Sequence, residues 1–230
     1  MRRVALTALL GWVCLAAHAE EACSSQCIEF QSSASRQVEN DLLLATLSLR
    51  LDAPTPAEVA RKLNTGLNGA LRLAAGYAGV RLRSGNQQTQ PVYGKNDRIV
   101  GWRGQAELQL ESRDFKSAAE LIGRLQDSLQ LTRLGFALAP ETQRSQENQV
   151  IQDALAAFRE RAETIRKSLG ASDYRVVRLS VQQGGQPGYP MLAMRAKAMD
   201  DSMPTPDFAA GDSQMSITVN GVIELLPRKP

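Results

Sequence analysis

The sequence predicts an α+β fold: a mostly antiparallel sheet with helices on one face. Alternation of apolar and polar residues, typical of half-buried strands, recurs between residues 41 and 226. Three other stretches carry apolar residues at spacings of three and four, as helices that pack on a sheet do. The order is strand-helix-strand-strand-helix-strand, then helix-strand-strand, and the first six elements match the ferredoxin-like βαββαβ pattern. We expect the later helix and strands to extend the same sheet.

The first strand and helix carry the clearest signals. Over residues 41–52 one set of alternate positions is apolar from residue 43 onward, and the other set is polar except for leucine, which predicts a strand with one apolar face. Thr55 is placed as the N-cap of the next helix, Pro56 at its first position, and Glu58 completes a capping box. Gly76 and Gly79 are stop signals for this helix.

The next two predicted strands, residues 80–93 and 98–112, form a hairpin around the turn sequence Gly-Lys-Asn-Asp. The second is the most regular strand in the chain. Its apolar face carries Val100, Trp102, Gly104, Ala106, Leu108 and Leu110. We therefore expect Trp102 to be a core residue, packed with Val100 and the two leucines.

The second half of the chain predicts two helices and three strands. A helix starts near Asp114, a strand runs through residues 134–138, and the longest helix covers about 143–169. Strands near 175–183 and 213–226 close the chain. Between them lies a segment, 184–212, rich in Gly, Pro, Met and Asp; connections this long are usually functional or flexible.

The chain opens with the layout of a secretory signal peptide. Arg2 and Arg3 precede an apolar stretch, and Ala17-His18-Ala19 is a small-x-small cleavage site. The alternative, a retained membrane anchor, is disfavoured because spanning needs about 20 apolar residues. We expect a signal peptide at 1–19 cleaved after Ala19, an N-terminal segment at 20–37 and a domain at 38–230. The mature protein would be periplasmic, with no transmembrane segment.

Composition argues against several classes of function. His18 is the chain's single histidine, so cleavage would remove the commonest general base and metal ligand. The chain has 27 basic and 24 acidic residues, and loss of Arg2 and Arg3 leaves a nearly neutral protein. With no basic stripe and few aromatic residues, a nucleic-acid partner is not expected. No nucleophile motif is present, so we expect a protein that is not an enzyme and has no cofactor.

Cys23 and Cys27 would remain after cleavage. An oxidising compartment favours a structural disulfide between them. Free or intermolecular thiols are an alternative, and redox or metal chemistry is another. The spacing is not the Cys-x-x-Cys of redox motifs, and two thiolates supply half a zinc site.

Five of the six methionines lie within 25 residues: Met191, Met194, Met199, Met203 and Met215. Such a cluster can cover an apolar surface or a subunit contact. It can also act as an oxidation sink, or hold a soft metal such as copper through its thioethers. The metal candidates are the first four.

Several stretches resemble the SIMPL-domain family of exported bacterial proteins: residues 33–64, 98–115, 151–181 and 216–225. The second carries a Gly-aromatic motif, Gly101-Trp102, and an Asp114-Phe115 pair that opens the next helix. Together with their connections they cover about residues 32–226. The chain differs from the family in two places. Many members have Gly-x-Gly where this chain has residues 28–33, and the Cys23/Cys27 pair is not a general feature of the family. It implies a cell-envelope protein that forms oligomers and is associated with stress tolerance, and it supplies no catalytic residues.

These observations lead to three hypotheses of function. The first is a self-associating scaffold or stress-protective module, with an unknown envelope protein as partner. Its contact would use the open edge of the closing strand, where Glu224 is the one charge, with residues 184–212 nearby. The second is a soft-metal or oxidant-handling protein that uses residues 191–215. The third is an enzyme with an unrecognised site.

Overall fold

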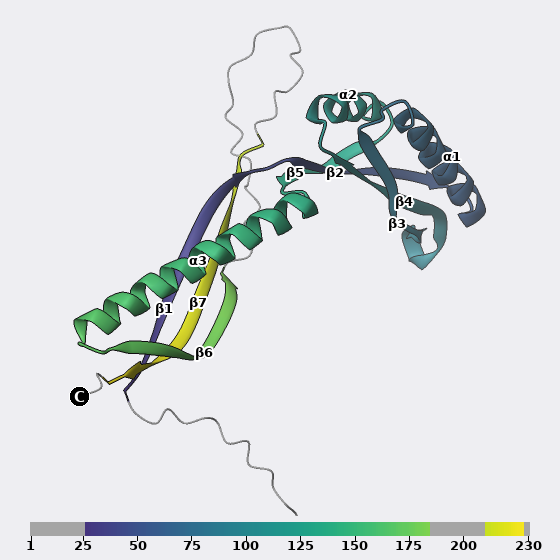
Figure 1. The fold of residues 1–230 in the computed structure, drawn as a ribbon. Helices are drawn as coiled ribbons and strands as arrows, with labels where there is room; N and C mark the ends of the chain where they lie inside the picture. The colour runs from purple at the N-terminus through teal and green to yellow at the C-terminus, as the bar shows by residue number, and fades with distance from the viewer. Residues whose placement is uncertain (1–25, 185–209, 228–230) are drawn as a thin grey trace, which may run out of the picture.

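The computed structural model describes residues 26–184 and 210–227, and it contains two separate antiparallel sheets (Figure 1). A four-stranded sheet has the order β3-β4-β2-β5, and a three-stranded sheet has the order β1-β7-β6. The elements are β1 (Cys27–Glu39), β2 (Leu42–Ala53), α1 (Pro56–Ala74), β3 (Val80–Tyr93), the 3₁₀ turn η1 (Lys95–Asp97), β4 (Ile99–Ser112), α2 (Phe115–Leu125), β5 (Gln130–Ala137), α3 (Pro140–Ser168), β6 (Asp173–Gly184) and β7 (Asp212–Leu226).

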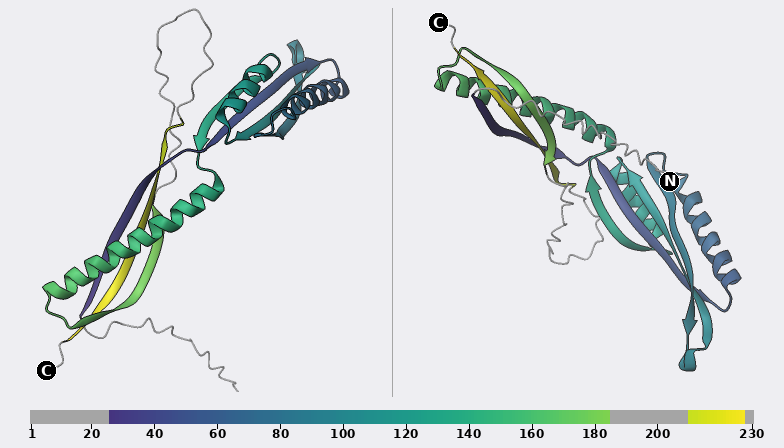
Figure 2. Two further views of the ribbon diagram at one scale, coloured as in Figure 1. Left: turned by 45° about the horizontal axis from the view of Figure 1, so that its top comes forward. Right: turned by 90° about the horizontal axis from the view of Figure 1, so that it is seen from below.

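The four-stranded sheet with α1 and α2 is the predicted ferredoxin-like unit. Its elements follow the βαββαβ order, and both helices lie on one face (Figure 2). The helix starts agree with the sequence signals, because the Thr55 side chain accepts a hydrogen bond from Glu58 N at 3.3 Å. Asp114 caps α2 in the same way through Ser117 N at 3.0 Å. The predicted α+β class is confirmed.

The core of this unit lies between the sheet and its two helices. Its fully buried residues come from β2, β4 and both helices: Leu43, Leu47, Val59, Leu63, Leu108, Leu110, Leu121 and Leu125. Trp102 is half-buried and packs at the margin of this core, so it is less central than predicted. Val100, expected beside it, is 65% exposed because β4 continues beyond the sheet at that point.

The expectation that the last helix and strands extend the first sheet is wrong. β6 and β7 form a second sheet together with β1, which the sequence analysis did not identify as a strand. β1 begins at Cys27, inside the segment 20–37 that was set apart from the domain, and pairs with β7 along its whole length. β7 is therefore the central strand, and its predicted open edge is also wrong. Its charge, Glu224, is buried and forms an ion pair with Arg175 of β6.

A second core lies between the three-stranded sheet and α3. Phe158 of α3 stacks on Phe30 of β1, with ring centroids 4.5 Å apart and planes 12° apart. The Phe158 ring lies directly over Gly221, where a Cβ atom would be 2.6 Å from its Cζ. Gly221 is therefore required for this close approach of helix and sheet. The core is completed by Val150, Ala154, Ala162, Met215, Ile217, Val219, Ile223 and Leu225.

Candidate functional site

Most of the residues that the sequence singled out lie outside the described part of the chain. The cleavage site after Ala19, Cys23, and the metal candidates Met191, Met194, Met199 and Met203 all lie there. Cys27 is disulfide-bonded at the start of β1, and its pairing with Cys23 stays a prediction. Met215 is buried on β7 beneath α3, where its thioether fills core volume.

The described part of the chain offers little support for metal binding. Within 26–184 and 210–227, no group of three or more His, Cys, Asp or Glu side chains is placed to hold a metal ion. In the same ranges, no helix is long and apolar enough to cross a membrane.

The two sheets are joined at Asn40 and Asp41, between β1 and β2. Asn40 is buried, and its backbone N–H donates to the Gly211 carbonyl at 3.0 Å. Its side-chain amide donates to the Ala210 carbonyl at 2.9 Å and accepts from the Ser213 hydroxyl at 2.6 Å. Asn40 thus ties the start of β7 to the point where the chain passes from one sheet to the other.

Asp41 ties the same point to α3. Its carboxylate accepts from Ala139 N at 2.7 Å and from the Thr142 hydroxyl at 2.6 Å, and it pairs with Arg113. Burial favours the neutral acid, but the Ala139 N–H, the Thr142 hydroxyl and the Arg113 guanidinium outweigh it. The pKa of Asp41 is therefore lowered below its usual 3.8.

We expect Asp41→Asn to lower the melting temperature at pH 7 by about 2–4 °C, which corresponds to roughly 1 kcal/mol in a protein of this size. A carboxylate with a lowered pKa contributes stability above its unfolded pKa and loses it as the pH falls through the folded value. The difference between variant and parent should therefore shrink below about pH 4. Differential scanning calorimetry between pH 3 and 7 measures both effects. Asp127→Asn, at an exposed position, is the control, and an equal shift in both variants would contradict the role of Asp41.

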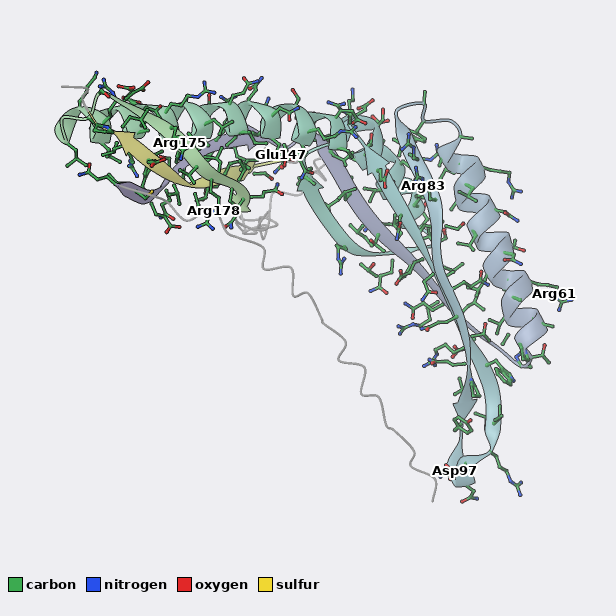
Figure 3. The ribbon with its side chains drawn as sticks, turned by 60° about the horizontal axis from the view of Figure 1, so that its bottom comes forward. Arg61, Arg83, Asp97, Glu147, Arg175 and Arg178 are labelled. Carbon is green, nitrogen blue, oxygen red and sulfur yellow. The ribbon has the colours of Figure 1, made fainter. Side chains whose placement is uncertain are left out.

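An extended hairpin arm, residues 91–101, projects beyond the four-stranded sheet. β2 ends at Ala53 opposite Trp102, so β3 and β4 continue from there as a two-stranded ribbon (Figure 3). Tyr93 pairs with Ile99, and both are exposed together with Val100. A two-stranded ribbon by itself is marginally stable in water, and this one carries three large apolar side chains that are exposed.

A second exposed apolar surface, the β6 stripe, consists of Val176, Leu179 and Val181. These residues lie opposite the buried β7 residues Ile223, Gly221 and Val219, on the face of the sheet that α3 covers. α3 packs mainly over β1 and β7, so it leaves this part of β6 uncovered. Leu169, at the end of α3, is exposed as well.

The open face of the four-stranded sheet has a different character, because it is polar. Arg103 and Asp52 form a two-pronged ion pair across it, with both N–O distances at 2.8 Å. The hydrogen bond from Arg103 lowers the pKa of Asp52. Arg81 and Glu111 pair at 3.7 Å eight residues further along β4, toward the other end of the sheet. Two of its ion pairs are thus formed within the sheet, and Arg50 donates a hydrogen bond to Gln105 Oε1 at 3.4 Å.

Sequence reasoning missed both apolar surfaces. The hairpin was predicted, but alternation placed Val100 in the core, and nothing local shows that β2 stops earlier than β4. The β6 residues look like a core strand in the sequence, because their exposure depends on where α3 lies over the sheet. One signal could have indicated the arm: the two predicted hairpin strands, 80–93 and 98–112, are longer than the neighbouring strand 41–52, so their ends must extend beyond it.

The comparisons with known proteins identify a family and leave the activity open. A family model, SIMPL, described as protein of unknown function (DUF541), matches residues 28–223. No curated protein matches the chain. A solved structure titled "The crystal structure of AtUAH in complex with glyoxylate" aligns at 12% identity and a TM-score of 0.29, over 44% of this chain and 28% of that one. A TM-score this low carries no argument about function. On the family match, which spans nearly all of the described residues, this chain belongs to the SIMPL family.

Proposed function

We propose that this chain is an exported cell-envelope protein without a catalytic site, which self-associates and acts as a scaffold or stress-protective module. The observation that carries self-association is the distribution of exposed apolar side chains. Seven large ones are exposed in the described ranges, each between 41% and 65%. Three lie on the hairpin arm, three on the β6 stripe, and Leu169 lies at the end of α3 beside β6. Grouped apolar side chains, unlike scattered ones, mark contact surfaces.

The two surfaces belong to different sheets, and the tip of the arm at Asp97 lies far from Arg178 of β6 (Figure 3). A contact between the arm of one copy and the β6 stripe of the next is therefore heterologous. Such contacts build rings when the rotation closes and filaments when it does not. A symmetric dimer through either surface alone would leave the other exposed, so the head-to-tail contact accounts for both.

Complementation of two variants tests this contact. In the first, Ile99 and Val100 are replaced by serine; in the second, Leu179 and Val181 are replaced by threonine. Analytical ultracentrifugation of residues 20–230 at micromolar concentration should show an oligomer for the parent and monomers for each variant alone. An equimolar mixture should give a heterodimer, because one intact arm and one intact stripe remain in each pair.

Two results would refute the contact. A parent protein that stays a strict monomer rules out self-association at these concentrations. Variants that assemble like the parent rule out these surfaces. Circular dichroism of each variant controls for folding, since all four positions are exposed and their substitution should leave the two cores intact.

Export is the other part of this proposal, and it is supported by the charged, apolar and small-x-small segments of residues 1–19. N-terminal sequencing of the protein from the periplasmic fraction should begin at Glu20. If the protein is found in the cytoplasmic fraction with Met1 still present, the export proposal is wrong.

A further inference from the structure

The outer edge of β1 offers unpaired backbone groups. At the two ends of the β1–β7 ladder, Leu225 N donates to the Gln26 carbonyl at 2.9 Å and Asn40 N donates to the Gly211 carbonyl at 3.0 Å. In an antiparallel pair the hydrogen-bonded residues alternate with residues whose N–H and C=O point the other way. The odd-numbered residues of β1 therefore point these groups away from β7. The Gln31 carbonyl shows this, because it accepts from Arg161 Nη1 at 2.6 Å.

This edge lacks the features that protect the other sheet edges. β3, β5 and β6 are also edge strands, and each has an interrupted register with its neighbour. β1 pairs with β7 through 13 residues without interruption and contains no proline. Among its outward positions the charged residues are Glu29 and Glu39, near the two ends, and the stretch from Gln31 to Gln37 carries no charge. Natural proteins usually protect long edges with bulges, prolines or charges, so this edge is open to an added strand.

A groove runs beside the same edge, between β1 and α3. A cavity of about 410 Å³ lies in it, lined by Ser32, Ser33, Ala157, Glu160, Arg161 and Thr164. Ser32 is 95% buried, since 5% of its surface is exposed, and its hydroxyl has no hydrogen-bond partner in the described ranges. A buried hydroxyl without a partner is costly, so its position at this cavity points to a group that binds there.

We propose that this groove binds an extended polypeptide segment, which adds a strand to β1 and places one short hydrogen-bonding side chain over Ser32. In strand addition, backbone hydrogen bonds supply affinity and a pocket for alternate side chains supplies specificity. The cavity suits serine, threonine or asparagine, because its floor is a hydroxyl and its rim carries the opposite charges of Glu160 and Arg161. A backbone N–H of the added strand replaces the guanidinium of the exposed Arg161 as the hydrogen-bond donor to the Gln31 carbonyl.

The geometry limits the length and pattern of the ligand. Outward positions 29–37 span nine residues, or about 30 Å at roughly 3.4 Å per residue. Successive side chains of the added strand alternate between the groove and the open side of the sheet. This site is independent of the arm and the β6 stripe, because β1 and β6 are opposite edges of one sheet.

A phage-displayed library of random nine-residue peptides, panned against residues 20–230, tests the proposal. Ser33→Pro is the counter-selection. It removes an outward N–H and leaves the bonds to β7 intact, as proline on an edge strand does. Ser33→Ala keeps the N–H and is the matched control. The parent should enrich peptides with Ser, Thr or Asn at one fixed position. In fluorescence anisotropy, Ser33→Pro should weaken a selected peptide at least tenfold, and Ser33→Ala less than twofold.

Hydrogen exchange gives a second readout that does not depend on the variant. The selected peptide should slow exchange at the amides of Gln31, Ser33 and Ser35, and Ser32→Val should reduce its affinity. The proposal is overturned if no enriched peptide distinguishes the parent from Ser33→Pro. The proposal is also overturned if raising the protein concentration, with no peptide present, slows hydrogen exchange at these amides. In that case a second copy of the chain would occupy the edge of β1. Neither result bears on the contact between arm and stripe.

Discussion

Phe158→Ala is expected to lower the free energy of unfolding by about 3–5 kcal/mol, the usual cost of truncating a buried aromatic residue. Phe158 is 2% exposed, stacks on Phe30 of β1 and lies over Gly221 of β7, the central strand of its sheet. Domains are stable by roughly 5–15 kcal/mol, so this loss is a large fraction of the total. The midpoint of urea denaturation, followed by circular dichroism, measures it.

Leu169→Ala is the matched control for this variant. Leu169 lies at the end of the same helix and is 61% exposed, so its truncation should change stability by less than about 0.5 kcal/mol. If Phe158→Ala unfolds at the midpoint of the parent, the packing of α3 on the three-stranded sheet is wrong.

Leu47→Ala should cost about 2–5 kcal/mol in the other core. Leu47 is fully buried on β2, which lies between β4 and β5 in the middle of the four-stranded sheet. Its truncation leaves a cavity in the core of the four-stranded unit. Thr89→Ala, at an exposed position on β3, is the control on the same sheet.

Hydrogen exchange on the two variants tests whether the cores are separate. The two sets of buried residues belong to different clusters, and the main contacts of α3 are with β1, β6 and β7. We expect Phe158→Ala to accelerate exchange chiefly in β1, β7 and α3, and Leu47→Ala chiefly in β2 and β4. Equal acceleration throughout both units would show that they unfold as one.

The elements of the four-stranded unit could be predicted because their signals are local. Thr55 and Asp114 cap their helices with their own side chains, and alternation along β2 and β4 reports one buried face. β1 lacks this signal. Its inner face carries Ile28, Phe30, Ala34 and Val38, but Ser32 and Arg36 interrupt it, and so the segment was not recognised as a strand.

The candidate surfaces could not be found in the same way. Exposure of Tyr93, Ile99 and Val100 follows from the end of β2 opposite Trp102, which local patterns do not encode. The open edge of β1 follows from its pairing with β7, about 190 residues later in the chain. The predicted edge on β7 failed for the same reason, because β1 occupies it.

Caps and periodicity act over a few residues, so the three helices and all strands except β1 could be predicted from the sequence, together with the α+β class and the family resemblance. Strand pairing instead depends on which distant segments bury each other's apolar faces. The division into two sheets, the central place of β7 and the edge position of β1 were therefore decided by packing: α3 and the inner faces of β1 and β7 enclose a core of their own around Phe158.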